Sequence, residues 1–217
     1  MDDLPLQDTS FSPLAHTING MKRTSHHEWG FVIYRCAYGD DAAWQRYLDL
    51  LKASVAETLD ILGRDVLLGP ILVWTVVEDQ GLDQATPEDV RSRFRVWASE
   101  KLAVLEKDIQ LDLSQLPPGA KVLSLPRHLP RFQFCVGVDA ACLEPLVSNT
   151  SSSGALNMLL VNGQDENSDP GTRGPASTTD SNYMKLPARS FCTAYEEAAR
   201  DMSWIMLCDN LPFMYNN

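Results

Sequence analysis

The apolar positions in the first third of the chain predict a strand, a helix and a second strand. Residues 31–36 and 71–77 are short, almost continuous apolar runs, which are typical of buried strands. Between them, residues 41–62 repeat apolar side chains three and four positions apart, the spacing of one face of a helix that ends at Gly63. This order predicts a βαβ unit, in which parallel neighbouring strands would be joined by a right-handed crossover.

The rest of the pattern predicts a second long helix and three further strands. Thr86 caps this helix, Pro87 takes its first position, and apolar residues at helical spacing continue from Val90 to Ile109. Short helices are expected at residues 139–146 and 193–200, and strands at residues 131–138, 155–161 and 202–208. We therefore predict an α+β fold, a two-layer sandwich of ferredoxin-like character with two long helices on one face of about five strands. A three-layer α/β arrangement is the alternative.

Two segments lack the apolar pattern of a packed core. Residues 1–27 hold Pro, Ser, Thr, Asn and Gly with little periodicity, which predicts a flexible N-terminal lead-in. Residues 163–182 contain no large apolar side chain, which is the composition of a disordered insertion. We therefore expect residues 28–217 to form a single α+β domain that carries this insertion.

Charge and cysteine usage narrow the classes of partner and compartment. The formal net charge of −11 disfavours nucleic acid and anionic membrane surfaces as partners. No apolar stretch is long enough to span a bilayer, and acids stand at the N-terminus where a secretory signal would be basic, so we expect a cytoplasmic protein. The five cysteines form no CxxC pair and are expected to be reduced thiols.

Candidate chemistry is confined to one edge of the predicted sheet. The chain has no standard motif for a nucleotide-binding loop, a hydrolase nucleophile or structural zinc, so we expect neither a cofactor nor a metal. If the strands at residues 31–36 and 71–77 are parallel, their carboxyl ends meet at an edge where ligands often bind. The polar side chains gathered there would be Arg35, Tyr38, Asp40, Asp41, Glu78 and Asp79.

This edge cluster allows two interpretations. Carboxylates crowded beside an arginine can have their pKa values driven apart, as acid–base catalysis requires, and Arg35, Tyr38, Asp41 and Glu78 would then be the catalytic residues. In the structural interpretation, the aspartates cap the helix that follows and Arg35 neutralises one of the acids.

Several blocks of the sequence resemble a group of uncharacterised proteins from filamentous ascomycete fungi. The most specific block is residues 29–44, WGFVIYRCAYGDDAAW. Further similar blocks are Trp74–Asp79, Val90–Trp97, Arg131–Val136 and Met202–Met206. The resemblance covers most of the chain from residue 27 on, apart from residues 163–182, and it implies a fungal source but no catalytic residues.

Three hypotheses for function follow. The first is an intracellular binding domain, whose partner is another protein or an apolar small molecule, because catalytic motifs are missing and the surface is acidic. The second is a cofactor-independent isomerase, cyclase or lyase of fungal secondary metabolism, working at the Arg35 edge. A third is a secreted effector that leaves the cell by an unconventional route.

Overall fold

The computed structural model describes residues 6–113, 126–147, 156–164, 182–200 and 204–213. Five strands form one mixed sheet with the order β2-β1-β3-β4-β5. β1 pairs in parallel with both β2 and β3, whereas β4 is antiparallel to both β3 and β5. The strands are β1 (Val32–Arg35), β2 (Thr75–Val77), β3 (Phe134–Val138), β4 (Asn157–Asn162) and β5 (Tyr183–Pro187).

Eight α-helices surround this sheet within the described ranges, so the predicted α+β class is confirmed. The long helices are α2 (Asp41–Ile61) and α4 (Pro87–Leu113). The others are α1 (Ala15–Thr24), α3 (Asp65–Leu68), α5 (Pro130–Gln133), α6 (Ala140–Val147), α7 (Phe191–Ala198) and α8 (Trp204–Phe213). None of the helices in the described part of the chain combines the length and the apolar character needed to cross a membrane.

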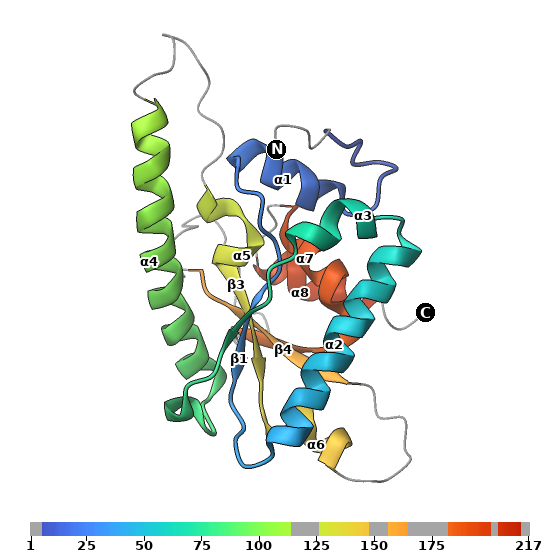
Figure 1. The fold of residues 1–217 in the computed structure, drawn as a ribbon, viewed down its shortest axis with the longest axis vertical. Coiled ribbons are helices and arrows are strands. Elements are labelled where there is room, and N and C mark those ends of the chain that lie inside the picture. The colour runs from blue at the N-terminus through green and yellow to red at the C-terminus, as the bar shows by residue number, and fades with distance from the viewer. Residues whose placement is uncertain (1–5, 114–125, 148–155, 165–181, 201–203, 214–217) are drawn as a thin grey trace.

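The two long helices lie on opposite faces of the sheet (Figure 1). Val32 and Tyr34 of β1 pack with Phe94 of α4 in one apolar cluster. Phe31 and Ile33 belong to the larger cluster on the other face, which includes the buried stripe of α2. Because successive side chains of a strand point to opposite faces, this division shows one layer of helix on each side of the sheet.

This arrangement corrects the prediction that both long helices share one face of a two-layer sandwich. The connection from β1 to β2 runs one way across the sheet, and the connection from β2 to β3 runs back past β1. Since parallel crossovers are almost always right-handed, reversing their direction places the second helix on the opposite face. The strands with helices α2, α4 and α6 between them follow the order β-α-β-α-β-α-β-β, which also differs from the β-α-β-β-α-β order of ferredoxin-like folds.

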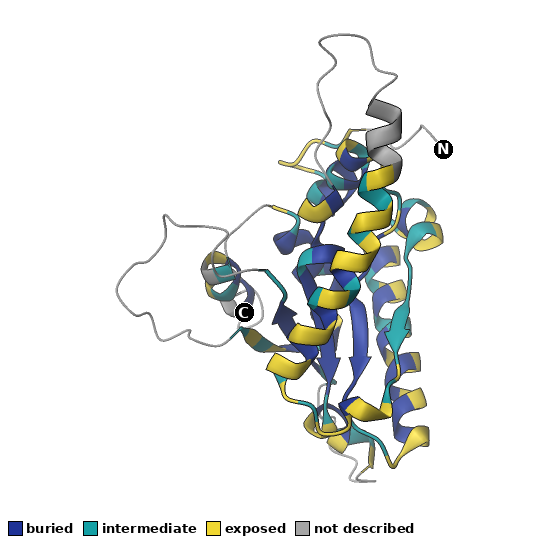
Figure 2. Ribbon diagram, turned by 90° about the vertical axis from the view of Figure 1, so that its left-hand side faces the viewer, coloured by how far each residue is buried: buried dark blue, intermediate teal, exposed yellow. Residues whose placement is uncertain are grey.

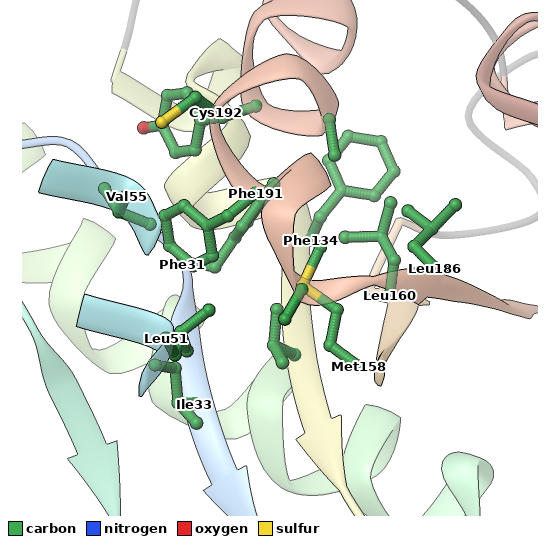
Figure 3. Close-up of a cluster of buried hydrophobic side chains, with 14 of the residues drawn as sticks. Phe31, Ile33, Leu51, Val55, Phe134, Met158, Leu160, Leu186, Phe191 and Cys192 are labelled. Atoms are coloured by element: carbon green, nitrogen blue, oxygen red, sulfur yellow. The ribbon is translucent and has the colours of Figure 1, made fainter. Parts of the chain in front are cut away.

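The larger core fills the space between the sheet and α2, α7 and α8. Phe31, just before β1, and Ile33 of β1 meet Leu51 and Val55 of α2, and Phe191 of α7 lies over Phe31 (Figure 3). The ring centroids of Phe31 and Phe191 lie 5.2 Å apart, and the two rings pack edge to face. This core therefore holds β1, the interior strand that carries Arg35, in place between β2 and β3.

Two local predictions of strands are wrong. Residues 202–208, predicted as the fifth strand, fall largely in helix α8, in which Leu207 and Leu211 lie one turn apart and are fully buried. A short apolar run is compatible with either a strand or a buried helix, so its pattern could not distinguish them. The fifth strand is β5 instead. At the start of the predicted strand 131–138, residues 130–133 form the short helix α5.

Helix α1 lies within the segment predicted as a lead-in. Its Ala15, Ile18 and Met21 side chains are fully buried against the larger core. Glu196 of α7 accepts hydrogen bonds from the backbone N–H groups at the start of α1, at 2.9 Å from both His16 and Thr17. A cap supplied from 180 residues away leaves no local signal in the sequence. Apart from its ends, the predicted insertion at 163–182 lies outside the described residues.

Candidate functional site

The structure brings all four predicted catalytic side chains together at the carboxyl edge of β1 and β2. Arg35 is the centre: its Nη2 donates a hydrogen bond to Asp41 Oδ1 at 2.5 Å, and its Nη1 lies 3.8 Å from Glu78 Oε2. The guanidinium carbon also lies 4.3 Å from the centroid of the Tyr38 ring. The predicted juxtaposition therefore exists, because β1 and β2 are parallel neighbours.

The contacts of Arg35 are those of a structural ion pair. Its side chain is only 5% exposed, whereas those of Asp41 and Glu78 are 88% and 48% exposed. Arg35 Nε donates to the carbonyl oxygen of Ala37 at 3.0 Å, and Trp44 Nε1 donates to Glu78 Oε1 at 2.6 Å. The buried guanidinium thus ties the carboxyl end of β2 to the start of α2.

The two remaining acids of the predicted cluster are occupied elsewhere. Asp40 accepts a hydrogen bond from the backbone N–H of Ala43 at 2.8 Å and caps α2, as the structural interpretation expected. Asp79 accepts hydrogen bonds from the backbone N–H of Gly81 at 2.9 Å and from Arg93 Nη2 of α4 at 2.6 Å. The cluster therefore divides, with Asp79 facing α4 and the Arg35 group facing α2.

A second buried arginine, which the sequence reasoning missed, fixes the amino end of β2. Arg131 of α5 donates from Nη1 to the carbonyl oxygen of Gly30 at 2.8 Å and from Nη2 to Thr75 Oγ1 at 2.6 Å. Its guanidinium carbon also lies 5.7 Å from the centroid of the Trp97 ring on α4. Arg131 and Arg35 thus hold the two ends of β2 in place, which makes this short strand a preorganised edge.

Of residues 71–77, predicted as a buried strand, only Thr75–Val77 form strand β2, while Ile71 ends a 3-10 helix and Leu72 makes an isolated bridge with Trp29. β2 lies at an edge of the sheet. Within the described chain β2 pairs with β1 alone, and residues 71–77 are half-buried (teal, at the right of Figure 2). Val73 donates its N–H to the carbonyl oxygen of Trp29 at 2.9 Å, toward the sheet. Because backbone groups alternate along a strand, the N–H and C=O groups of Trp74 and Val76 point away from β1.

The two edges of the sheet differ in how they are protected. β5, at the far edge, carries the exposed Lys185 and ends in Pro187, and both residue types discourage further strand pairing. Residues 71–77 at the near edge contain no charged residue and no proline. The apolar run was visible in the sequence, but its place at an edge depends on the strand order, which no local signal reveals.

A groove runs beside this edge, between β2, the loop that follows it and α4. It consists of two adjoining hollows, and we call it the α4 groove. The smaller hollow has a volume of about 310 Å³ and is lined by Tyr34, Val77, Arg93, Val96, Trp97 and Glu100. The larger, of about 670 Å³, shares Arg93 and Val96 as walls and extends along the loop to Asp79, Asp83 and Asp89. Both hollows are open toward solvent.

Tyr34 is the unusual member of the α4 groove. Its side chain is fully buried, yet its hydroxyl group has no hydrogen-bond partner in the structure. Burial also raises the pKa of this hydroxyl, so it keeps its proton at neutral pH and can donate it. An unpartnered buried hydroxyl is costly to stability, and this oxygen has no surface that is open to the hollow.

The larger hollow is acidic. Asp79, Asp83 and Asp89 line it together with Arg93, which is already paired with Asp79. Asp83 accepts the backbone N–H of Tyr38 at 3.1 Å, which joins this hollow to the Arg35 group. In the part of the chain that the structure describes, no three His, Cys, Asp or Glu side chains are grouped as a metal site. The excess negative charge therefore suits a cationic group of a partner.

No family model, no curated protein and no solved structure matches this chain. The resemblance to proteins of ascomycete fungi stays a prediction.

Proposed function

We propose that this chain is a protein-binding domain that takes up an extended segment of a partner protein at the free edge of β2. The observation that carries the proposal is that β2 and the residues before it (71–77) present an apolar edge with no charge and no proline, opposite an edge that has Lys185 and Pro187. Natural sheets usually protect such edges with charges, prolines, bulges or a covering element. An edge that is fixed at both ends by buried arginines and left open is suited to strand addition.

The added segment would be held in two ways. Its backbone would exchange hydrogen bonds with the outward N–H and C=O groups of Trp74 and Val76. Its side chains would point alternately toward the α2 side and into the α4 groove, because side chains alternate along a strand. Backbone pairing would supply affinity, and the side chains in the groove would supply specificity.

Electrostatics favour a basic partner. The whole chain has a formal net charge of −11, and the larger hollow of the α4 groove places three aspartates along the path of the added segment. Complementary charge accelerates encounter and selects the partner more than it raises affinity. The Arg35 group supports this function by holding β2, so the edge predicted as catalytic is the frame of the proposed binding surface.

Substituting Val76 tests strand addition. Val76→Pro removes an outward N–H without removing a hydrogen bond to β1, and Val76→Ala is the matched control that shortens the side chain and keeps the N–H. Peptides selected from a random heptapeptide library on the full wild-type chain are measured against both variants. We expect Val76→Pro to weaken binding at least about tenfold relative to Val76→Ala, with both variants folded by circular dichroism.

Three results would contradict the proposal. The library could yield no binder, or the selected peptides could bind all three proteins equally. The wild-type chain could also sediment as a dimer that Val76→Pro dissociates, in which case the edge pairs with a second copy of this chain.

A further inference from the structure

The residue of an added strand that lies opposite Val77 would meet the smaller hollow of the α4 groove. Val77 is the last residue of β2, packs on the α4 side of the sheet and lines this hollow. Neighbouring strands lie about 5 Å apart, so side chains that share a face across two strands touch. The neighbour of Val77 therefore contacts a wall of the hollow directly and needs no contact with β1, which lies behind β2.

The walls that such a side chain can reach are mainly apolar. Val96 of α4 is 55% exposed, and Val77 and Trp97 are half-buried, so each of the three keeps surface open to solvent. Arg93 and Glu100, which carry opposite charges, are the other exposed walls. An aliphatic occupant would remove the apolar surface from water, whereas a charged occupant would lose hydration against it. The smaller hollow therefore favours an aliphatic side chain.

Two positions further along the same face, the added strand would meet the larger hollow. Asp79 follows Val77 by two residues and keeps an extended backbone, and it lines the larger hollow with Asp83 and Asp89. Among the described residues that line this hollow, Arg93 is the single basic side chain, and it is already paired with Asp79 at 2.6 Å. A lysine or arginine of the partner would therefore meet an excess of negative charge, and an acid would be repelled.

We propose that the partner segment carries an aliphatic and a basic residue two positions apart, with the aliphatic side chain in the smaller hollow and the basic one at the larger hollow. This inference rests on the proposed function, since it names the side chains that the added strand presents to the α4 groove. Charge complementarity points to a basic segment of another protein. A second copy of this chain would bring its own edge at residues 71–77, which contains no basic residue.

The spacing of the two residues is the part of the motif that the sheet dictates. Side chains alternate along a strand, so residues that are adjacent in the sequence point to opposite faces and cannot both enter the groove. A segment parallel to β2 would read aliphatic, any residue, basic. An antiparallel segment would read basic, any residue, aliphatic.

The test uses two heptapeptides, Ser-Thr-Leu-Thr-Lys-Thr-Ser and Ser-Thr-Lys-Thr-Leu-Thr-Ser, which present the pair in the parallel and the antiparallel direction. Their controls, Ser-Thr-Leu-Lys-Thr-Thr-Ser and Ser-Thr-Lys-Leu-Thr-Thr-Ser, keep the composition and the charge but put leucine and lysine on opposite faces. All four are titrated against the full wild-type chain. This comparison needs no protein variant, so it decides even where a substitution disturbs the fold.

Two substitutions in the protein test the two contacts separately. Val96→Ser removes the exposed apolar wall, and Val104→Ser is the matched control, because Val104 is an exposed valine of α4 that lines neither hollow. Asp83→Asn removes one charge of the larger hollow and keeps an oxygen that can accept the backbone N–H of Tyr38. Asp49→Asn, at an exposed aspartate of α2, is its control.

We expect one of the paired peptides to bind the wild-type chain at least about fivefold more tightly than its control of the same composition. Val96→Ser should weaken that peptide about three- to fivefold. Asp83→Asn should weaken it about two- to fivefold, and this loss should disappear at about 1 M salt. Val104→Ser and Asp49→Asn should bind as wild type, and circular dichroism should show all four variants folded.

The possible failures can be told apart. Equal affinity for the paired peptides and their controls, with Val76→Pro still weakening the library-selected peptides, would overturn the motif and leave strand addition standing. Failure of all four peptides to bind the wild-type chain would also overturn the motif, while the library selection judges strand addition separately. Losses for Val104→Ser or Asp49→Asn as large as those for the groove variants would mean that the peptides bind elsewhere, and would overturn it too.

Discussion

Arg35 is a buried cation that lies beside two exposed acids, Asp41 and Glu78. These three side chains therefore contribute unequally to the stability of the protein. The guanidinium carbon of Arg35 lies 4.3 Å from the ring centroid of Tyr38 and 5.3 Å from that of Trp44, and the guanidinium donates hydrogen bonds to a backbone carbonyl and to Asp41. Removing Arg35 therefore removes packing and several hydrogen bonds at once. Removing the charge of Asp41 leaves Arg35 close to Glu78, and the exposed position of Asp41 limits what is lost.

We expect Arg35→Ala to lower the free energy of unfolding by about 2–4 kcal/mol, from lost packing and hydrogen bonds. Asp41→Asn should lower it by no more than about 1 kcal/mol, because an exposed ion pair contributes little. Urea unfolding at pH 7 gives both values. An Asp41→Asn protein as unstable as Arg35→Ala would contradict this division of roles.

The sequence predicted the chemistry of the Arg35 group from local cues alone. A lone arginine on an apolar strand requires an acid partner, and parallel strands place Glu78 beside it. No comparable local cue points to Arg131 or to the Tyr34 hydroxyl. The partners of Arg131 lie up to 101 residues away, and Tyr34 looks like any aromatic core residue until its surroundings are known.

Helix α4 begins with a capping motif that the sequence predicts and that can be tested by its dependence on pH. Thr86 and Asp89 form a reciprocal cap, in which Thr86 donates its N–H and its hydroxyl to Asp89 Oδ2 at 2.9 Å and 2.6 Å. These hydrogen bonds lower the pKa of the Asp89 carboxyl below its ordinary value of 3.8. The charged form is therefore favoured by folding.

The cap gives a pH dependence with a definite sign. A lowered pKa in the folded state stabilises the protein above the unfolded pKa near 3.8, and this contribution is lost as the pH falls through the lower folded value. We expect Asp89→Asn to be less stable than wild type at pH 7, and the difference to shrink as the pH falls below the ordinary pKa of 3.8. Thermal melts across this range measure it, and a difference that grew toward acid would contradict the assignment.

The long helices were predicted to within a few residues, whereas the strands were predicted less well. The apolar stripe of α2 repeats along almost the whole helix, and both helices have clear start signals, so their local patterns suffice. Whether a short apolar run forms a strand depends on what it pairs with. The run at residues 202–208 lies largely in helix α8. Strand β5, which follows the polar segment at residues 163–182, turns only Met184 and Leu186 inward and therefore has a weak apolar pattern.

At the scale of the whole molecule, strand order decides both the layers and the binding surface. The order β2-β1-β3 reverses the direction of winding, which separates α2 from α4 and places β2 at an edge beside α4. Neither consequence can be read from the sequence, because the same elements can be wound in several ways. The α4 groove is a product of topology, and so is the openness of the edge.

The most direct test of strand addition is residue-resolved amide hydrogen exchange along residues 73–78 by NMR, with and without a library-selected heptapeptide at saturation. In the free protein we expect the outward amides of Trp74 and Val76 to exchange much faster than the inward amides of Thr75 and Val77. The bound peptide should slow exchange at Trp74 and Val76 and leave Thr75 and Val77 nearly unchanged. Outward amides already protected in the free protein, or protection that rises evenly along the strand, would contradict the proposal that this edge is open and takes up a partner strand.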